Sequence, residues 1–187
     1  MKITTIGRGT IGGKLGRLWT AAGHEMTELG RDGGDAGDAD VVLLAVPGEA
    51  VPDALARLTG LRGKVVLDAT NRAGVVEHPA PAGYRSIPQY VKTETGGPIA
   101  KAFNVNFGSV LDQAATASSR PNVIWVGDEG ARAAVEQLCR DIGMEPLNAG
   151  PLENAAIQEE FAKMLVAMLR DAGEGPLFYR FAAPQNF

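Results

Sequence analysis

The first twelve residues contain the feature that most constrains the fold of this chain. A strand-like segment, Lys2 to Ile6, leads directly into a glycine-rich turn with the spacing GxGxxG and then into the start of a helix. In this pattern Gly7 permits a tight turn, Gly9 lets the main chain approach a ligand, and Gly12 lets the helix pack closely against the strand. A pyrophosphate would lie over the free N–H groups of the first helical turn. The pattern therefore predicts a dinucleotide-binding turn, the alternative being a turn that serves packing alone.

Beyond this turn, apolar strand-like segments alternate with helical patterns, and the sequence contains no internal repeat. This alternation is typical of a doubly wound α/β sheet that is mainly parallel, the Rossmann-like architecture. We predict a single Rossmann-like NAD(P)-binding domain over residues 1–187. Further strands are expected at 24–29, 40–46, 64–69, 98–104, 122–126 and 144–147. Helices are expected at 13–22, 48–58, 107–117, 131–142 and from 151 onward.

Two connections and one strand depart from a regular plan. The second strand is polar enough to lie near an edge of the sheet. Residues 30–38 are rich in glycine and aspartate and too short for a full helix, so the second crossover is expected to shrink to a turn or two. Residues 73–94 contain many turn formers and prolines, which predicts a surface excursion with one helical turn around Gln89 to Thr93.

The C-terminal part combines an amphipathic helix with an aromatic tail. Residues 175–181 are too aromatic for a disordered end, so the tail is expected to dock on the body of the protein. The helix or the tail could instead form a homodimer contact. The apolar stripe of the helix is expected in the core or in a subunit contact, and it comprises Leu152, Ala156, Ile157, Phe161, Met164, Leu165 and Met168.

The composition excludes several classes of function. A net charge of −4 argues against a polyanion-binding surface, so no nucleic-acid partner is expected. No apolar run approaches the roughly 20 residues of a membrane span, so no membrane anchor is expected. Lys2 directly precedes strand-like sequence, so no signal peptide is expected, and the default location is the cytoplasm.

The single cysteine, Cys139, lies in a helical pattern and is expected to be buried and structural. His24 and His78 are far apart, so no metal site is expected.

In a doubly wound sheet, ligands bind beyond the carboxyl ends of the strands, where the strand order reverses. The expected strand ends are the glycine turn, Val46-Pro47 and Thr70-Asn71, with Asn104 closing the row. Asp68 and Asn71 invite catalytic interpretations, but an Asp at a strand end more often orders a turn, so no general base is assigned. Hydride transfer between two bound rings needs none, because positioning is the main task.

The choice of nucleotide depends on the end of the second strand. An acidic residue there would hold the ribose 2′-hydroxyl of NAD. Gly30 and Arg31 occupy this tip instead, and a guanidinium suits bidentate recognition of the 2′-phosphate of NADP. The alternative is that Arg31 is a solvated charge paired with Asp32. Arg8, inside the glycine turn, offers a second positive charge if it does not point into solvent. NADP(H) is therefore favoured over NAD(H).

Several stretches together resemble a known family. They are GRGTIGGKLGRLWTAAGHE, the Gly30-Arg31 tip, LLAVP, VVLDATN and AKAFN, and they resemble the NADP oxidoreductases that depend on coenzyme F-420, a deazaflavin, as well as the oxidoreductase domain of the STEAP metalloreductases. The resemblance implies hydride exchange between NADP(H) and a deazaflavin or flavin, with no catalytic side chain. It also implies an NADP groove, with Asn104 near the nicotinamide, lined by Thr10, Ile11, Arg31, Val46, Pro47, Asn71 and Asn104.

Two other functions stay open at this point. One is an NADPH-dependent reductase of a small imine or carbonyl compound, against which stands the lack of the extra helical domain that such enzymes usually carry. The other is a non-catalytic NADPH-binding module that senses redox state, which the lack of acid and base groups favours. The shortened segment at 30–38 and the compact C-terminus depart from the F-420-dependent family, so the second redox substrate is less well defined than NADP(H).

Overall fold

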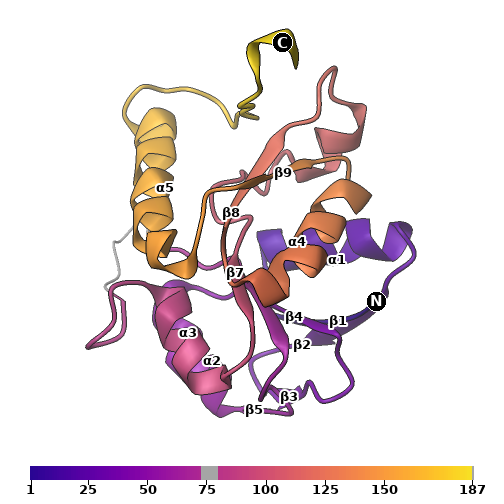
Figure 1. Ribbon diagram of the computed structural model, residues 1–187, viewed down its shortest axis with the longest axis vertical. Coiled ribbons are helices and arrows are strands. Elements are labelled where there is room, and N and C mark those ends of the chain that lie inside the picture. Colours follow the sequence, from indigo (N-terminus) through magenta and orange to yellow (C-terminus); the bar gives the residue numbers. More distant parts are fainter. Residues whose placement is uncertain (73–79, 187) are drawn as a thin grey trace.

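The computed structural model describes residues 1–72 and 80–186, and a seven-stranded sheet forms its centre. The strand order is β2-β1-β4-β6-β7-β8-β9, and every neighbouring pair is parallel except β7 and β8 (Figure 1). The predicted doubly wound, mainly parallel α/β fold is therefore confirmed. The strands are β1 Lys2–Ile6, β2 Glu25–Leu29, β4 Val41–Leu44, β6 Val65–Asp68, β7 Ile99–Lys101, β8 Asn122–Gly127 and β9 Glu145–Asn148.

The burial of each strand follows its sequence. β4 consists of four apolar residues, all buried, because helices cover both faces of the sheet at this position. β2 mixes polar and apolar residues, all of them partly or fully exposed, and lies at one edge of the sheet, as its polarity predicts. β1 lies between β2 and β4, so the strand order reverses beside the glycine turn. The turn therefore sits at the switch point, where doubly wound sheets bind their ligands.

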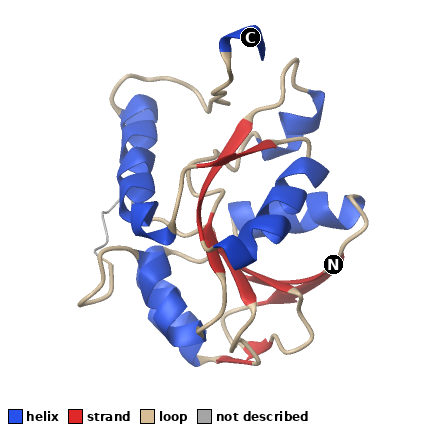
Figure 2. Ribbon diagram, in the orientation of Figure 1, coloured by secondary structure: helices blue, strands red, loops and turns tan. Residues whose placement is uncertain are grey.

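Helices cover both faces of the sheet (Figure 2). Side chains from α1 (Thr10–Ala21) and α4 (Glu129–Asp141) join one core cluster with one face of the strands. Side chains from α2 (Val51–Ala56) and α3 (Ile87–Thr95) join a second cluster with the other face. The C-terminal helix α5 (Ala155–Arg170) stands beside the end of the sheet that carries β8 (Figure 1).

Three single residues, Trp19, Cys139 and His24, are buried with their polar groups accounted for, and the burial expected of Cys139 is confirmed. Trp19 is fully buried, and its indole N–H donates to the carbonyl of Leu138 at 2.9 Å, which ties α1 to α4. Cys139 is buried, and burial raises the pKa of its thiol far above the usual range, so it is a structural cysteine. His24 is satisfied, with its Nε2 atom 2.9 Å from a carboxylate oxygen of Asp141. His78 lies outside the described residues.

Three predicted elements differ in the structure. Residues 107–117 do not form an α-helix; a 3₁₀ helix spans Leu111–Thr116, and its two buried residues, Leu111 and Ala114, are three positions apart, as the tighter helix requires. β7 ends at Lys101 instead of continuing to Asn104. In place of one turn at Gln89 to Thr93, the nine-residue helix α3 forms because Pro88 suits its first turn and Gly96 ends it in the left-handed conformation. Residues 73–79 of the predicted excursion lie outside the described part.

The C-terminal helix turns a different face inward from the one expected. Ile157 and Met164 are 69% and 60% exposed, so the first of the two expectations for the stripe, a place in the core, is wrong for these two residues, and a subunit contact stays a prediction. Their neighbours Gln158 and Glu159 are buried instead, because polar groups at the end of β7 receive them. The buried face consists of Ala155, Gln158, Glu159, Ala162 and Leu165.

The aromatic tail contacts the body of the protein. In the tail, the carbonyl of Tyr179 accepts a hydrogen bond from the main chain of Asn122 at 3.0 Å, and Phe178 packs against the larger core cluster.

Among the described residues, no helix has both the length and the apolar character that crossing a bilayer requires. The cytoplasmic location stays a prediction from the sequence.

Candidate functional site

The glycine turn has the tight geometry that its spacing predicts. Gly7 adopts a φ of +101°, and a Cβ atom there would lie 2.4 Å from the carbonyl oxygen of Ala45. A Cβ atom on Gly12 would lie 2.2 Å from the carbonyl oxygen of Gly7, so only glycine lets α1 start this close to the strand. Gly9 differs, because its missing Cβ would meet nothing within 4 Å. The main chain at Gly9 and the free N–H groups that begin α1 therefore border open space.

The other expected strand ends meet this turn. A Cβ atom on Gly7 would touch Val46, and one on Gly48, directly after Pro47, would lie 2.5 Å from the carbonyl oxygen of Asn71. Thr10 and Ile11, at the start of α1, contact Gly108 from the loop after β7. Parallel strands bring their carboxyl ends to one edge of a sheet, which explains why residues so distant in sequence converge here.

The side chain of Arg8, in the glycine turn, packs against the tip of β2. The Arg8 guanidinium donates to the carbonyl of Glu28 at 3.1 Å, and a Cβ atom on Gly30 would lie 3.5 Å from its central carbon. Although the Arg8 side chain is 61% exposed, it crosses the end of β2 and does not simply point into solvent. Arg31 is exposed beside it, and no ion pair joins it to Asp32, both being described residues. The pairing considered as an alternative for Arg31 is therefore absent.

A cavity of about 210 Å³ lies beside the start of α1 and the segments that follow β6 and β7. Three asparagine amides supply its polar groups, and among the described residues that line it none has a titratable side chain. Phe103, in its wall, adopts a φ of +65°, which is unusual for a bulky residue and marks local strain beside the site. The lining residues are Ile11, Ala69, Asn71, Phe103, Asn104, Val105, Asn106, Phe107, Gly108, Ala162, Leu165 and Val166.

Amide groups connect the two asparagines that the sequence placed here. Asn104 donates from Nδ2 to Oδ1 of Asn71 at 3.0 Å, and Asn71 donates back to the carbonyl of Asn104. Gln158 of α5 donates to Oδ1 of Asn104 at 2.6 Å and to the carbonyl of Ile124 at 3.0 Å. Asn104 is thus part of the site although β7 ends before it. Sequence reasoning missed Gln158, because it lies beside Glu159 and Glu160 in an amphipathic helix, where polar residues are ordinarily exposed.

A buried network of charges lies under these amides. Lys101 and Asp68 are fully buried, and their Nζ and Oδ2 atoms are 3.0 Å apart. Glu159, also fully buried, lies 3.2 Å from Nζ of Lys101 and 2.7 Å from Nε of Arg72, and it accepts from the main chain of Ile87 at 3.1 Å. The network therefore joins β6, β7, α3 and α5.

Asp68 has the structural role that its position predicts. Its second oxygen accepts a hydrogen bond from the main chain of Thr70 at 2.9 Å, which orders the turn after β6. Lys101 and Glu159 were not singled out from the sequence. A signal was present for Lys101, a charged residue inside the apolar segment 98–103, because such a residue is buried only with a partner. Glu159 gave no such signal, because Gln158 and Glu160 flank it in the sequence.

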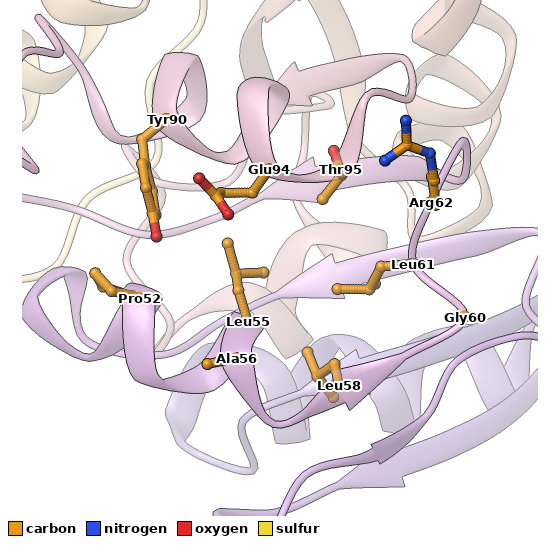
Figure 3. Close-up of a pocket in the computed structure, with 10 residues that line it drawn as sticks. All are labelled: Pro52, Leu55, Ala56, Leu58, Gly60, Leu61, Arg62, Tyr90, Glu94 and Thr95. Atoms are coloured by element: carbon orange, nitrogen blue, oxygen red, sulfur yellow. The ribbon is translucent and has the colours of Figure 1, made fainter.

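A second cavity, of about 300 Å³, lies between α2 and α3 (Figure 3). Leucine side chains form its floor, and Tyr90 and Glu94 project from α3 above them. Burial and the nearby Glu94 raise the pKa of Tyr90. None of the residues expected to bind a nucleotide lines this cavity, which separates it from the groove at the strand ends.

Several solved structures share this architecture. The structure of a candidate F420-dependent NADP reductase from Arthrobacter sp. FB24 matches with a TM-score of 0.82 at 19% identity, over 98% of this chain and 100% of that one. The hypothetical protein SMa0349 from Sinorhizobium meliloti matches with a TM-score of 0.68 at 25% identity, over 83% and 88% of the two chains. A reductive aminase from Aspergillus terreus, in complex with NADPH and ethyl levulinate, matches with a TM-score of 0.66 at 17% identity.

The share of the matched protein that this chain covers differs among these structures. The reductive aminase match covers 92% of this chain and 62% of the aminase. A scan against protein-family models finds no match. At these identities the comparisons establish the fold, and they confirm at that level the resemblance to F-420-dependent NADP oxidoreductases. The chain has the Rossmann-like fold that NADP-dependent reductases of this kind share.

Proposed function

We propose that this protein is an oxidoreductase that transfers a hydride between NADP(H) and a deazaflavin, such as coenzyme F-420, or a flavin. The observation that carries the proposal is the cavity beyond β6 and β7, whose described lining offers apolar surface and amides but no titratable side chain. Reduction of a carbonyl or imine ordinarily uses a positioned proton donor. Hydride exchange between two planar rings requires close stacking and the exclusion of water instead.

The NADP(H) part of the proposal rests on the opposite end of the groove. An acidic side chain at Gly30 would repel a 2′-phosphate, and the space above Gly30 holds the Arg8 guanidinium instead. Arg31 extends the positive charge at the exposed rim. Both groups suit a phosphate because a guanidinium presents several donors in one plane. The open space at Gly9 suits the pyrophosphate that connects the two ends.

In the proposed hydride transfer, the protein positions its two ligands and supplies no reacting group. When bound, NADP(H) and the deazaflavin or flavin would supply the hydride chemistry, and the proton that balances reduction of the acceptor would come from solvent. Asn71 and Asn104 would hold the nicotinamide carboxamide, because their reciprocal hydrogen bonds fix the two amides in place. Phe103 and Phe107 keep water from the reacting faces, which strengthens the local electrostatic interactions.

The reductive aminase match supports a second candidate, reduction of a small imine or carbonyl compound by NADPH. One observation weighs against it: the described cavity lining offers no proton donor. A third reading, a redox-sensing module that binds NADPH without turnover, is favoured by the same lack of acid and base groups.

One experiment separates the three readings. The purified protein is mixed with NADPH and, one at a time, with oxidised coenzyme F-420, FMN, FAD and a ketone with an amine, and the absorbance of NADPH and of each acceptor is followed. The proposal expects one deazaflavin or flavin reduced for each NADPH consumed. Consumption of NADPH with the ketone and amine alone would replace the proposal by the second reading. Binding of NADPH without any reduction would replace it by the sensor.

We also propose that the chain works as a single NADP-binding unit and assembles as a homodimer through α5. Ile157 and Met164 of α5 and Phe181 of the tail are large apolar side chains that are 69%, 60% and 54% exposed. Exposed apolar groups of this size are typical of contact surfaces. Light scattering on the wild type and on Ile157→Ser/Met164→Ser tests this, and a wild-type monomer would contradict it.

A further inference from the structure

The segment between β2 and β4 is not the loose glycine turn that its composition suggests. Residues Gly34–Asp35 form a short strand, β3, which pairs in parallel with β5 (Leu58–Thr59), the segment after α2 (Figure 1). The wall beside Arg31 is therefore built from two crossovers, one after β2 and one after β4. The crossover after β2, described over its whole length, has no helix. The segment after α2, which belongs to the next crossover along the chain, supplies the strand β5 that pairs with β3.

Close main-chain contacts fix this segment. The main-chain N–H groups of Gly34 and Ala36 donate to the carbonyls of Arg57 and Thr59 at 3.2 and 2.9 Å. A Cβ atom on Gly33 would lie 2.0 Å from the carbonyl oxygen of Arg57, so glycine is required for the approach. Asp35 accepts from the hydroxyl of Thr59 at 2.9 Å. The glycines thus serve tight packing, and the main chain that carries Arg31 is held in place.

Arg57 is the residue that joins the two crossovers most directly. It follows α2 immediately, and its Nη1 atom donates to the carbonyl oxygen of Arg31 at 3.0 Å. Arg57 is exposed, and this hydrogen bond holds its guanidinium against the main chain of Arg31. Arg8 lies over Gly30 on the other side of the same tip. Arginines from three separate segments therefore lie at the end of β2, where the Glu28 carboxylate also comes within 4.0 Å of the Arg8 guanidinium.

We infer that Arg57 is a positioning residue for the selection of NADP(H) over NAD(H): it holds the main chain of Arg31 and adds positive charge, so that the 2′-phosphate is recognised by a rim composed of Arg8, Arg31 and Arg57. The inference rests on the proposed use of NADP(H). Its physical basis is that a preformed donor loses less conformational freedom on binding than a mobile one. A second arginine nearby also raises the local positive potential.

The test measures binding without any redox reaction. Isothermal titration calorimetry compares 2′,5′-ADP with 5′-AMP, which lacks the 2′-phosphate, on the wild type, Arg57→Met and Arg57→Lys. We expect Arg57→Met to weaken 2′,5′-ADP about tenfold and to change 5′-AMP less than about twofold. Arg57→Lys should recover part of the loss, because an ammonium can still donate to the carbonyl of Arg31. In steady-state assays Arg57→Met should raise KM for NADPH and leave kcat unchanged.

Arg62→Met is the matched control, because Arg62 is an exposed arginine beside the second cavity and loses the same charge. It should leave both affinities unchanged. Equal loss of 2′,5′-ADP affinity in Arg57→Met and Arg62→Met, or no loss in Arg57→Met, overturns the inference while leaving NADP(H) use intact. Failure of the wild type to prefer 2′,5′-ADP overturns the choice of NADP(H) itself, and the inference with it. Thermal unfolding of each variant confirms that it is folded.

Discussion

The charged side chains are exposed in one region of the candidate site, the end of β2, and buried in the other, the ends of β6 and β7. At the end of β2 the arginine side chains are exposed, and Arg8 is 61% accessible to solvent. At the ends of β6 and β7 the charged side chains of Asp68, Lys101 and Glu159 are fully buried, and Lys101 together with Arg72 balances the two carboxylates beneath a surface of amides. Under the proposed function, the exposed arginines would attract a phosphate. The buried network would instead support a rigid, charge-balanced wall beside the reacting rings.

The largest expected effect tests the rigid end. Glu159→Ala leaves Lys101 and Arg72 without their shared buried partner, and breaking a buried ion pair costs about 3–5 kcal/mol of the free energy of unfolding. Urea denaturation measures the loss. Glu160→Ala is the matched control, since that neighbouring carboxylate is 55% exposed and should change stability by less than about 1 kcal/mol. Similar effects of the two substitutions would show that the buried network adds no stability.

The next prediction tests the charged end. Arg31→Ala should weaken NADPH binding by about 1.5–3 kcal/mol, the contribution of a set of charge-assisted hydrogen bonds, and should leave NADH binding nearly unchanged. Fluorescence titration of both nucleotides measures the difference, and the free energy of unfolding should stay the same because the side chain is exposed. Equal losses for NADPH and NADH would remove the case for NADP(H) selection at this tip.

A pair of glycine substitutions separates packing from ligand binding in the turn between the two ends. Gly12→Ala places a Cβ atom 2.2 Å from a carbonyl oxygen and should cost about 1–3 kcal/mol of stability. Gly9→Ala meets nothing within 4 Å, so it should leave stability unchanged and weaken NADPH binding alone. Thermal unfolding and nucleotide titration on both variants check this. Normal NADPH affinity in Gly9→Ala would show that the ligand does not approach the main chain there.

The smallest expected effect concerns pH. Because no titratable side chain belongs to the described lining of the cavity, kcat for reduction of a deazaflavin or flavin should vary less than about twofold between pH 6 and pH 8. Single-turnover rates at saturating NADPH measure it. A bell-shaped profile would reveal an acid or base at the reacting end and would weaken the contrast between the two ends.

Local rules predicted the regular parts of the fold. The apolar run at 40–46 produced a central buried strand, and the polar residues of 24–29 produced an edge strand. The prediction was less accurate where tertiary contacts compete with local preference. Residues 111–116 formed a 3₁₀ helix, and α5 buried Gln158 and Glu159 while exposing Ile157 and Met164. Hydrophobic periodicity cannot anticipate a helix whose inward face meets buried polar partners on other elements.

The sequence by itself determined the glycine turn, the strand ends that converge on it and the arginine at the tip of β2. These features follow from steric rules and from the regular topology of parallel sheets, which act over short segments. Only the tertiary structure decided that Arg8 covers Gly30, that Arg57 reaches the main chain of Arg31, and that Glu159 joins Lys101 and Arg72. Such contacts join residues tens of positions apart, so no local pattern encodes them, and their energies depend on burial that exists only once the chain is folded.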